Sequence, residues 1–595
     1  MKSSFADIRE FIEFLDSRGQ LLRVRDAVSA DLEISKITDA ESKKPGGGMA
    51  LLFENVLDGG RRSFPVATNL FGSSDRMAWA LGVGDIREIE RRIESIVSLA
   101  PPRGLGEIWG AAKKLLPLAR ILPKKFRGKL APCQEIAEIG EEVDLSRIPV
   151  LKCWPHDGGR FVTLPLVFTK SPDSKRRNLG MYRLQVYDKN TTGMHWHIHK
   201  DAAHFYGEYR AAGRRMPVAV AIGADPATIY SATAPLPRGM DELMLSGFLR
   251  GRGVRLVKCK TVDLEVPADA EFVLEGYVEP DELRLEGPFG DHTGYYSLAD
   301  MYPVFHVTAV TRRRNPVYCA TLVGPPPMED CYMAKATERI FLPLLKTVLP
   351  EISDYFLPWE GVFHNITIVS MRKEFPAHAR RLACGLWGQG QMSFSKALVL
   401  VDSDIDPSDL KKIWRLFIDS FDPVADVHLS EGVLDALDHS APSPLCGSKI
   451  AIDLTRRVGG EPERARFPIR PPSKEDMESA EDFARSQIGG IARMAFKEGF
   501  CAIALDKAGR RGADILEKIR DCGLFDGKFR AVAIFDADVN PADTSKILWK
   551  IFNNTDPRRD ILVSAKSGLC LVDACKKTLA DGHAREWPQE LTFEG

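Results

Sequence analysis

Two similar runs of residues lie 134 positions apart in this chain, and this repeat limits the possible fold more than any other feature. The acid-rich run 402–409 (DSDIDPSD) matches 536–543 (DADVNPAD), and the Asp-Pro pair at 422–423 matches the pair at 556–557. A strand-like apolar run precedes the first acidic turn, and a helix-like run follows it. The repeat predicts two copies of one strand–turn–helix unit, and we expect these copies to pair, within one chain or between chains.

The acidic turns could in principle bind calcium or begin helices. The alternating aspartates from Asp402 onward resemble the start of an EF-hand loop. However, Pro407 stands where that loop requires glycine, and Ile413 stands where it requires a bidentate acid. We therefore predict that Asp409 and Asp543 cap the helices that follow the turns.

The residue pattern changes along the chain and divides it into segments. Between about 145 and 325, short β-rich runs such as Val218–Ile222 and Val304–Val310 are separated by glycine and proline, which predicts a β-barrel or mixed sheet. From about 330 to 455, strand-like and helix-like runs alternate, as in βαβ units. A proline-rich stretch at 467–472 marks a linker. We expect a multidomain α+β and α/β protein with domains at 1–130, 131–328, 329–460 and 461–595, the last containing the second copy of the repeat.

Individual elements follow from apolar spacing. Helical spacing predicts helices at 5–20, with Gly19 as C-cap, and at 85–99, 377–386 and 409–417. Short apolar runs predict strands at 21–24, 50–53, 162–168, 272–278, 366–369 and 397–401.

Composition excludes several classes of protein. Lys+Arg is 81 and Asp+Glu is 82, so the net charge of −1 gives no sign of a nucleic-acid or anionic-membrane partner. No apolar run approaches the ~20 residues of a membrane span, and acids occupy the N-terminus where a signal peptide is apolar, so we expect a cytoplasmic protein. The 11 scattered cysteines contain no CxxC pair, which favours reduced, buried thiols over disulfides or structural zinc.

The strongest local signal for chemistry is the run 286–296 (EGPFGDHTGYY). Its three glycines and one proline predict a turn-rich loop that carries Glu286 and Asp291. Two acids held close together in a dry site have separated pKa values, which suits proton transfer. The alternative is that Asp291 only stabilises a turn, and the spacing alone does not decide between them.

A second signal joins the run 178–183 (NLGMYR) to the run 194–200 (MHWHIHK). If the latter is a strand, His195, His197 and His199 share one face. At ~3.3 Å per residue the outer two lie ~13 Å apart, so at most one or two can bind one metal ion. A packed or hydrogen-bonded histidine is the usual alternative.

A third signal is the acidic pair Asp241 and Glu242, which precedes the helix-like run Leu243–Leu249. Acids at this position stabilise a helix N-terminus. Spacing alone does not make Glu242 a metal ligand.

Together these segments resemble the UbiD family of prenylated-flavin-dependent decarboxylases, from about residue 5 to about 455. The resemblance implies an N-terminal α/β domain, a split β-barrel that binds the flavin, and a C-terminal oligomerisation domain. It implies a divalent metal, usually manganese, on Asn178, His199 and Glu242, with potassium as a further ion. The implied catalytic residues are Arg183, Glu286 and Asp291. The implied cofactor contacts are Met181, Tyr182, Arg183, His195, Trp196, His197, Lys200, Asp201 and Lys396, with His195 and Lys200 standing where some members have arginine.

The implied reaction is removal of CO2 from a hydroxyaromatic acid. The negative charge left on the ring carbon needs an electron-sink cofactor, and the resemblance implies prenylated FMN, supplied by a flavin prenyltransferase. Arg183 would orient the substrate carboxylate and hold Glu286 ionised, while Asp291 would deliver the proton to the ring. The resemblance also implies a homo-oligomer, either a dimer or a hexamer.

The runs 191–196 and 335–344 look most like the menaquinone branch of the family, which would act on 1,4-dihydroxy-6-naphthoate. The closest alternative is a 4-hydroxybenzoate-type or polycyclic aromatic enzyme that works in the carboxylation direction. Two rivals of other classes are a non-catalytic subunit of a larger carboxylase and a flavin oxidoreductase. The first would lack the Arg–Glu–Asp set, and the second would require a nicotinamide site, for which no GxGxxG run opens a βαβ unit.

Overall fold

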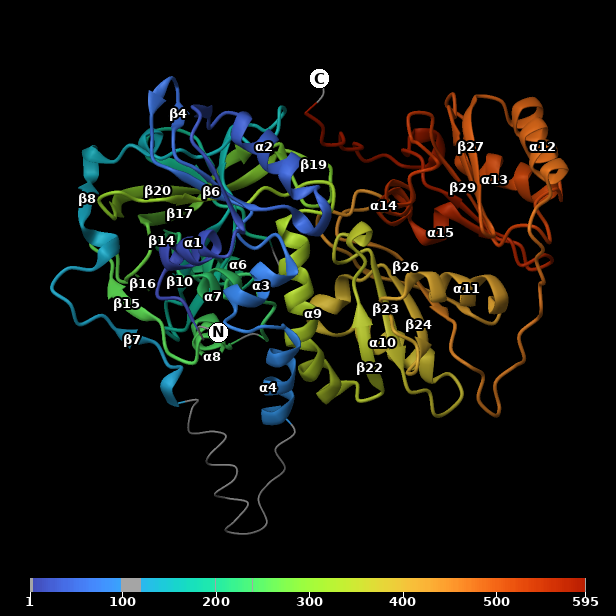
Figure 1. Cartoon of the computed structure of the whole chain (residues 1–595), viewed down its shortest axis with the longest axis horizontal. Coiled ribbons are helices and arrows are strands. Elements are labelled where there is room, and N and C mark those ends of the chain that lie inside the picture. Colours follow the sequence, from blue (N-terminus) through green and yellow to red (C-terminus); the bar gives the residue numbers. More distant parts are fainter. Residues whose placement is uncertain (1–3, 98–118, 198–199, 238, 594–595) are drawn as a thin grey trace, which may run out of the picture. The chain divides into compact units, whose positions relative to one another are not determined.

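The computed structural model describes residues 4–97, 119–197, 200–237 and 239–593. The chain divides into two compact units, one formed by residues 1–343 together with 589–595 and the other by residues 344–588 (Figure 1). Each unit is described by itself.

The first unit begins with a small α/β layer. Helix α1 (Ile8–Ser17) confirms the predicted first helix, with Asp7 as its N-cap and Gly19 at φ +66° just beyond its end. The four-stranded sheet has the order β1-β3-β6-β21. Its strands are β1 (Leu21–Val24), β3 (Ala50–Phe53), β6 (Val66–Thr68) and β21 (Tyr318–Cys319), and the other helices are α2 (Glu33–Ser42), α3 (Ser74–Ala80) and α4 (Arg87–Val97). The last of these confirms the helix expected at 85–99.

The centre of the first unit is a curled, nine-stranded antiparallel sheet that forms a half-barrel, which confirms the split barrel of the predicted multidomain fold (Figure 1). Its order is β11-β10-β14-β17-β20-β13-β12-β9, with β8 paired to β20. The strands are β8 (Ile136–Ile139), β9 (Arg160–Val162), β10 (Pro165–Lys170), β11 (Arg177–Gly180), β12 (Leu184–Val186), β13 (Thr191–Gly193), β14 (Met216–Ile222), β17 (Phe272–Glu286) and β20 (Asp300–Arg312). The single strand expected at 162–168 is in fact two, because β9 ends at Val162 and β10 begins at Pro165, where the proline has no N–H for a ladder bond.

Two features of this sheet place the candidate site. Strands β17 and β20 are its longest, and the loop between them begins directly after Glu286. Helices α6 (Asp201–Ala211), α7 (Pro226–Ser231) and α8 (Glu242–Arg250) contact each other or the sheet. Asp241 is the N-cap of α8 and accepts a hydrogen bond from the N–H of Leu243, as its position before the apolar run suggested.

The second unit contains two five-stranded sheets with the same strand order and the same strand directions. The first sheet runs β22-β23-β24-β26-β25 and the second runs β27-β28-β29-β31-β30. The first copy comprises β22 (Ile352–Phe356), β23 (Ile366–Met371), α10 (His378–Trp387), β24 (Ala397–Asp402), α11 (Leu410–Ser420), β25 (Val427–Val433) and β26 (Cys446–Asp453). The second comprises α12 (Lys474–Phe483), β27 (Ile491–Lys497), β28 (Phe500–Leu505), α13 (Gly512–Asp521), β29 (Ala531–Asp536), α14 (Thr544–Asn554), α15 (Pro557–Asp560), β30 (Ile561–Val563) and β31 (Cys570–Asp573). The repeat is therefore a whole α/β unit, larger than the strand–turn–helix piece visible in the sequence.

Both acidic turns begin helices. Asp409 accepts a hydrogen bond from the N–H of Lys412, and Asp543 accepts one from the N–H of Lys546. The predicted helix caps are confirmed.

The two copies pack against each other within the chain. The indole of Trp414 in the first copy donates to the carbonyl of Glu498 in the second at 2.9 Å. The amide of Asn365 in the first copy donates to Asn553 in the second at 3.0 Å, where both side chains are buried. Pairing of the related units is thus satisfied inside one chain.

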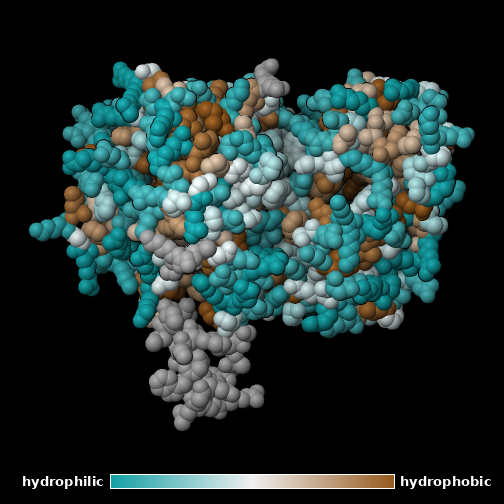
Figure 2. Space-filling model, viewed as in Figure 1, coloured by the Kyte–Doolittle hydropathy of each residue, from teal (hydrophilic) through white to brown (hydrophobic). Residues whose placement is uncertain are grey.

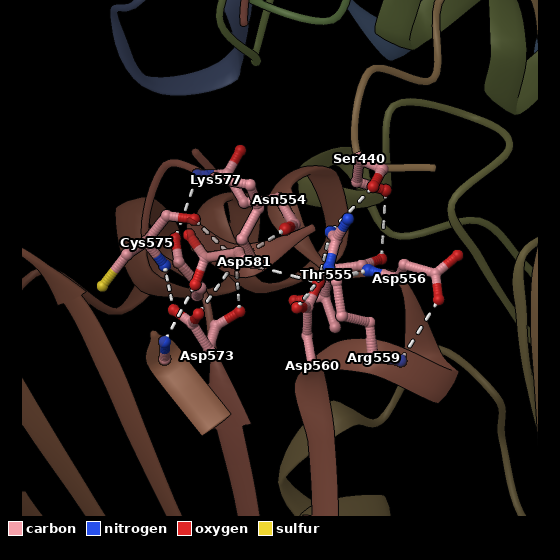
Figure 3. Close-up of polar contacts among 12 residues, drawn as sticks. Ser440, Asn554, Thr555, Asp556, Arg559, Asp560, Asp573, Cys575, Lys577 and Asp581 are labelled. Atoms are coloured by element: carbon pink, nitrogen blue, oxygen red, sulfur yellow. Dashed lines mark hydrogen bonds and ion pairs between the residues drawn. The ribbon is translucent and has the colours of Figure 1, made fainter. Parts of the chain in front are cut away.

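A network of buried charges closes the second copy (Figure 3). The side chain of Lys577 is fully buried and donates to the carbonyls of Asn554, Asp573 and Cys575, at 3.2, 2.9 and 2.7 Å. Its Nζ lies 3.7 Å from a carboxylate oxygen of Asp560. A buried ammonium needs this number of oxygen partners because it has left water.

The first copy contains the same network with arginine in place of lysine. Arg457 pairs with Asp426 and Asp453. Lys373 in the first copy and Lys507 in the second hold corresponding positions, and each pairs with two acids. Since each copy satisfies its charges internally, we interpret both networks as structural.

Lys577→Ala is expected to lower the free energy of unfolding by about 3–5 kcal/mol, because it removes one of the buried cations beside Asp560 and Asp573 and leaves three main-chain carbonyls without their donor. The matched control is Lys576→Ala, since Lys576 is the exposed neighbour and its loss should change stability by less than about 0.5 kcal/mol. Thermal unfolding of the two variants and the parent protein measures the difference. Equal midpoints for both variants would contradict the structural role of the network.

The polarity of the surface, the length of the helices and the state of the cysteines agree with the expectations from composition. The face shown in Figure 2 is mostly hydrophilic, with apolar patches scattered between polar ones. Within the described residues, every helix falls short of the length and hydropathy that crossing a bilayer requires. All eleven cysteines are free thiols, and only Cys384 and Cys446 are exposed.

Candidate active site

Arg183 lies at the centre of a cluster of buried ionisable side chains. It stands in the connection between β11 and β12, so the curled sheet fixes its main chain on both sides. Its Nη1 donates to Asp291 Oδ2 at 2.6 Å, and its Nη2 donates to Glu286 Oε1 at 2.9 Å. The guanidinium carbon lies 4.5 Å from the centroid of the Phe289 ring. Two carboxylates and an aromatic face therefore fix the orientation of this guanidinium.

A chain of hydrogen bonds extends from Glu286 to two histidines. Glu286 Oε2 lies 2.7 Å from His195 Nδ1, and His195 Nε2 lies 2.7 Å from His197 Nε2. A carboxylate only accepts, so His195 Nδ1 carries a proton, and in a neutral ring Nε2 then accepts from His197. The His195 ring also stacks on Tyr302, with centroids 4.2 Å apart.

The strand geometry assumed for the histidines is wrong. Strand β13 ends at Gly193, and residues 194–197 are irregular. The rings of His195 and His197 nevertheless meet, with their Nε2 atoms 2.7 Å apart. His199 lies outside the described residues.

Asp291 lies in the tight turn of a small hairpin, which confirms the predicted turn-rich loop. The hairpin pairs β18 (Phe289–Gly290) with β19 (Tyr296–Ser297). Asp291 Oδ1 accepts a hydrogen bond from the N–H of His292 at 2.8 Å and lies 3.0 Å from His292 Nδ1. Its other oxygen is left to face Arg183, so the turn presents one carboxylate oxygen to the guanidinium.

The electrostatics of the cluster keep both acids ionised. Burial alone would raise the pKa of Glu286, but Arg183 and His195 hold it below its ordinary value. Burial likewise opposes ionisation of Asp291, yet His292 and Arg183 bring its pKa far below the ordinary value. Burial and the neighbouring Arg183 lower the pKa of His195, so this ring is neutral. One guanidinium therefore serves two buried carboxylates, and His292 adds a second partner for Asp291.

Glu242 contacts the strand that carries Asn178, and both side chains have oxygen atoms that suit a hard cation. Glu242 is the first residue of α8, and its Oε2 accepts from the N–H of Leu179, next to Asn178, at 3.0 Å. Burial raises the pKa of Glu242 to about 7, and no cationic side chain of the described residues pairs with it. A buried carboxylate that accepts from a main-chain N–H, without a cationic partner among the described residues, fits a divalent ion that supplies the missing charge. Among the described residues, no group of three or more His, Cys, Asp or Glu side chains is placed to hold a metal, and His199 is not among them.

The expected cofactor contacts of the first unit lie close to these groups in the chain. Tyr182 and Trp196 are buried, and Lys200 and Asp201 begin helix α6. The main-chain N–H of Met181 donates to the carbonyl of Ala232 at 3.0 Å. The indole Nε1 of Trp196 is buried and has no hydrogen-bond partner among the described residues, which fits an acceptor on a bound cofactor.

Lys396 belongs to the second unit. Its Nζ pairs with Asp438 at 2.9 Å and lies 3.0 Å from the hydroxyl of Ser440. Its role beside a cofactor phosphate stays a prediction.

Three residues of the cluster gave no separate signal in the sequence. Ser297 accepts from Arg183 Nη2 at 3.0 Å, and Phe289 supplies the aromatic face. Asp157 ties the hairpin to the segment around Trp154, since its Oδ1 accepts from the N–H of Gly290 at 2.7 Å and its Oδ2 from the N–H of Trp154 at 2.8 Å. Phe289 lies inside the run 286–296, so attention to every side chain of that run would have found it, whereas Asp157 is far away in sequence.

Three family models match most of the chain. A model described as the 3-octaprenyl-4-hydroxybenzoate carboxy-lyase (UbiD) Rift-related domain matches residues 124–326. The model of the N-terminal domain of the same enzyme matches residues 12–96. The model of its C-terminal domain matches residues 331–454 and 492–579, which cover parts of both copies of the repeat.

Similar proteins fall into two length classes. An uncharacterized protein of Archaeoglobus fulgidus is 46% identical over 467 residues, which cover 78% of this chain and 95% of that protein. An uncharacterized protein of Helicobacter pylori is 37% identical over 593 residues, which cover 98% of this chain and 94% of that protein. The second class therefore shares almost the full length of this chain.

Two solved structures share the fold. The vanillic acid decarboxylase of Sedimentibacter hydroxybenzoicus in its closed form has a TM-score of 0.68 and 27% identity, and the match covers 81% of this chain and 99% of that one. The enzyme HmfF of Pelotomaculum thermopropionicum in complex with FMN has a TM-score of 0.64 and 28% identity, with coverage of 80% and 99%.

Proposed function

Because the chain belongs to the UbiD family of carboxy-lyases, we propose that it catalyses the non-oxidative decarboxylation of a hydroxyaromatic acid with prenylated FMN, and that Arg183, Glu286 and Asp291 carry the reaction. The observation that carries this proposal is one guanidinium hydrogen-bonded to two buried carboxylates, at 2.6 and 2.9 Å. Such an arrangement can bind a third carboxylate and can move a proton in the same place.

When bound, prenylated FMN would act as the sink for the electrons that CO2 leaves on the ring carbon. The protein supplies orientation and proton transfer. Arg183 binds the substrate carboxylate, while Glu286 keeps the guanidinium in place through two of its nitrogens. His195 fixes the second oxygen of Glu286, so the acid cannot rotate away.

Asp291 is the group that takes up a proton when substrate is bound and passes it to the ring carbon. In the structure it is an ionised carboxylate, because Arg183 and His292 stabilise its charge. A substrate carboxylate that engages Arg183 competes for this stabilisation, so the pKa of Asp291 rises toward a value at which its Oδ2 can carry a proton. Asp291 then donates that proton to the ring carbon. In the reverse direction the ionised form is ready to accept it, so the same geometry serves carboxylation.

For the substrate we propose 1,4-dihydroxy-6-naphthoate, an acid of menaquinone synthesis. This proposal rests on the runs 191–196 and 335–344, which look like that branch of the family. The alternative is a 4-hydroxybenzoate-type or polycyclic acid, and it gains support from the similar vanillic acid decarboxylase. Release of CO2 from a panel of these acids by the flavin-loaded protein tests the two, and activity only toward single-ring acids would overturn the first.

Loading with cofactor tests the enzyme class. We expect the protein made together with a flavin prenyltransferase to carry a flavin absorbance different from that of the protein made without it. A non-catalytic subunit would bind no flavin in either case, and a flavin oxidoreductase would be reduced by a nicotinamide nucleotide.

We further propose that Asn178, His199 and Glu242 hold a divalent ion, with manganese as the expected metal and potassium as a second ion. The ion would tether the cofactor phosphate. Glu242→Gln is expected to lower metal affinity by at least about 10–100-fold, since even the outer partners of metal ligands contribute that much. Metal content of the purified protein, with flavin content beside it, measures the effect.

The matched control is Asp263→Asn, because the side chain of Asp263 is 79% exposed in the same unit. It should retain full metal and flavin. Equal metal content in Glu242→Gln and in the control would remove Glu242 from the site.

A further inference from the structure

We propose that the last residues of the chain, Gln589–Phe593, form a strap that holds the turn of Asp291 in its working position. Leu591 and Phe593 are then positioning residues for the reaction proposed above, on which this inference rests. The strap comes from the far end of the sequence, since the chain leaves the second unit after Pro588 and its last residues belong to the first.

Main-chain hydrogen bonds join the strap to the hairpin of Asp291. The N–H of Tyr296 donates to the carbonyl of Gln589 at 2.9 Å, and the N–H of Leu591 donates to the carbonyl of Gly294 at 3.0 Å. Between them Tyr295 and Glu590 form an antiparallel bridge. The strap therefore runs antiparallel to the start of β19 through one isolated bridge, where Figure 1 draws the red end of the chain.

Side chains anchor the strap as well. Leu591 is 7% exposed and belongs to the hydrophobic core of the first unit. The ring of Phe593 stacks on Trp154, with centroids 4.4 Å apart and an angle of 26° between the planes. Trp154 is itself fixed, because its indole donates to the carbonyl of Val323 at 2.9 Å.

The anchored tryptophan also touches the hairpin. A Cβ at Gly290, next to Asp291, would lie 2.1 Å from the Trp154 ring, so the indole packs directly on the main chain there. The indole thus lies against the hairpin and stacks on the ring of Phe593. Loss of Phe593 would free one face of Trp154 and loosen its contact with Gly290.

The hairpin residues that the strap bonds belong to the stretch that shapes the turn of Asp291. The N–H of Asp291 donates to the carbonyl of Tyr295 at 3.1 Å, and the N–H of Gly294 donates to the carbonyl of Asp291 at 3.0 Å. The strap bonds two further main-chain groups of this stretch, the carbonyl of Gly294 and the N–H of Tyr296. The turn is closed from inside by its own bonds and from outside by the strap.

A positioning role differs from general stabilisation in what it changes. Arg183 and Glu286 do not contact the strap in any described interaction, and they are fixed by β11, β12 and β17. Loss of the strap should therefore lower kcat by about 10–100-fold, as small displacements of a reacting group do, while KM and flavin content change little.

The test uses the full chain in four variants. One ends at Pro588, and Phe593→Ala removes only the stacked ring. Phe593→Tyr keeps an aromatic ring and should restore kcat to within about twofold, and Thr592→Ala changes an exposed neighbour and should do the same. We measure kcat, KM, flavin and metal content, and hydrogen exchange at the amides of Asp291, Gly294 and Tyr296. We expect the truncated and Phe593→Ala proteins to lose exchange protection at these amides together with kcat.

Two outcomes would contradict the positioning role of the strap. One is an unchanged kcat in the truncated protein, and the other is a loss of kcat explained by an equal loss of flavin. Failure of the proposed function is distinguishable, because the parent protein would then release no CO2 from any aromatic acid while hydrogen exchange would still report whether the strap protects the hairpin.

Discussion

Replacing Asp291 with asparagine is expected to lower kcat by about 10²–10⁴-fold while the protein keeps its flavin. The exchange keeps the size of the side chain and an oxygen that can accept from Arg183 Nη1, which lies 2.6 Å away in the parent protein. It removes the only feature that proton transfer needs, a group that can both bind and release a proton. The loss should therefore appear in kcat, with a smaller change in KM.

The matched control for this exchange is Asp300→Asn. Asp300 is exposed at the start of β20, close to Asp291 in sequence but without contact to Arg183 in the described interactions. Its exchange should leave kcat within about twofold of the parent value. Full activity in Asp291→Asn would show that the proton comes from elsewhere, and the imidazole in direct contact with Asp291 is that of His292, at 3.0 Å.

Deuterium gives a second reading of the same step. If Asp291 delivers the proton, the product formed in deuterated water carries deuterium at the carbon that lost CO2. In Asp291→Asn that transfer limits the rate, so we expect a solvent isotope effect on kcat larger than in the parent protein. An unchanged isotope effect with lowered kcat would point to a defect in substrate binding.

Local patterns predicted the elements of this fold well where apolar spacing alone decides them. Helix α1 is an example, and the caps Asp409 and Asp543 were found as easily because one residue type before a helix is enough to predict a cap. The strand considered for the run 194–197 is not formed, because alternation of histidine with apolar residues also occurs in irregular chain.

The full extent of the repeat was hidden by one loop. The connection between β25 and β26 spans 434–445, whereas the matching connection between β30 and β31 spans only 564–569. Past this point the constant offset of 134 no longer holds, so the last strand of each copy does not align by position. Only the sheet order shows that the whole unit is duplicated.

The candidate site came from family resemblance, because its members are far apart in the chain. Arg183 and Asp291 meet only through the curvature of the sheet, and no local spacing contains that information. The strap was beyond prediction for a different reason. Main-chain hydrogen bonds join Gln589 and Leu591 to the hairpin, and main-chain groups are the same in every residue but proline.

Exchanging Arg183 for lysine is expected to lower kcat/KM by about 10²–10⁴-fold, although the charge is kept. The guanidinium reaches Glu286 and Asp291 at once through separate nitrogens, whereas a lysine has one nitrogen on a differently shaped stem. Each hydrogen bond to a charged group contributes about 1.5–3 kcal/mol, so the loss of two such bonds gives this range at about 1.36 kcal/mol for each tenfold change. Steady-state rates of CO2 release, with flavin content as a check on folding, measure the effect.

Arg284→Lys is the control that separates geometry from charge. Arg284 is exposed and lies over the ring of Tyr187, outside the cluster, so its exchange should change kcat/KM by less than about twofold. If Arg183→Lys retained full activity, a point charge would suffice and the fork of the guanidinium would have no role in orienting the substrate. If it lost activity together with flavin, Arg183 would serve cofactor binding. Loss of kcat/KM with flavin retained is the result that the hydrogen bonds to Glu286 and Asp291 predict. A lysine cannot hold both carboxylates at once, and it cannot orient the substrate carboxylate as the guanidinium does.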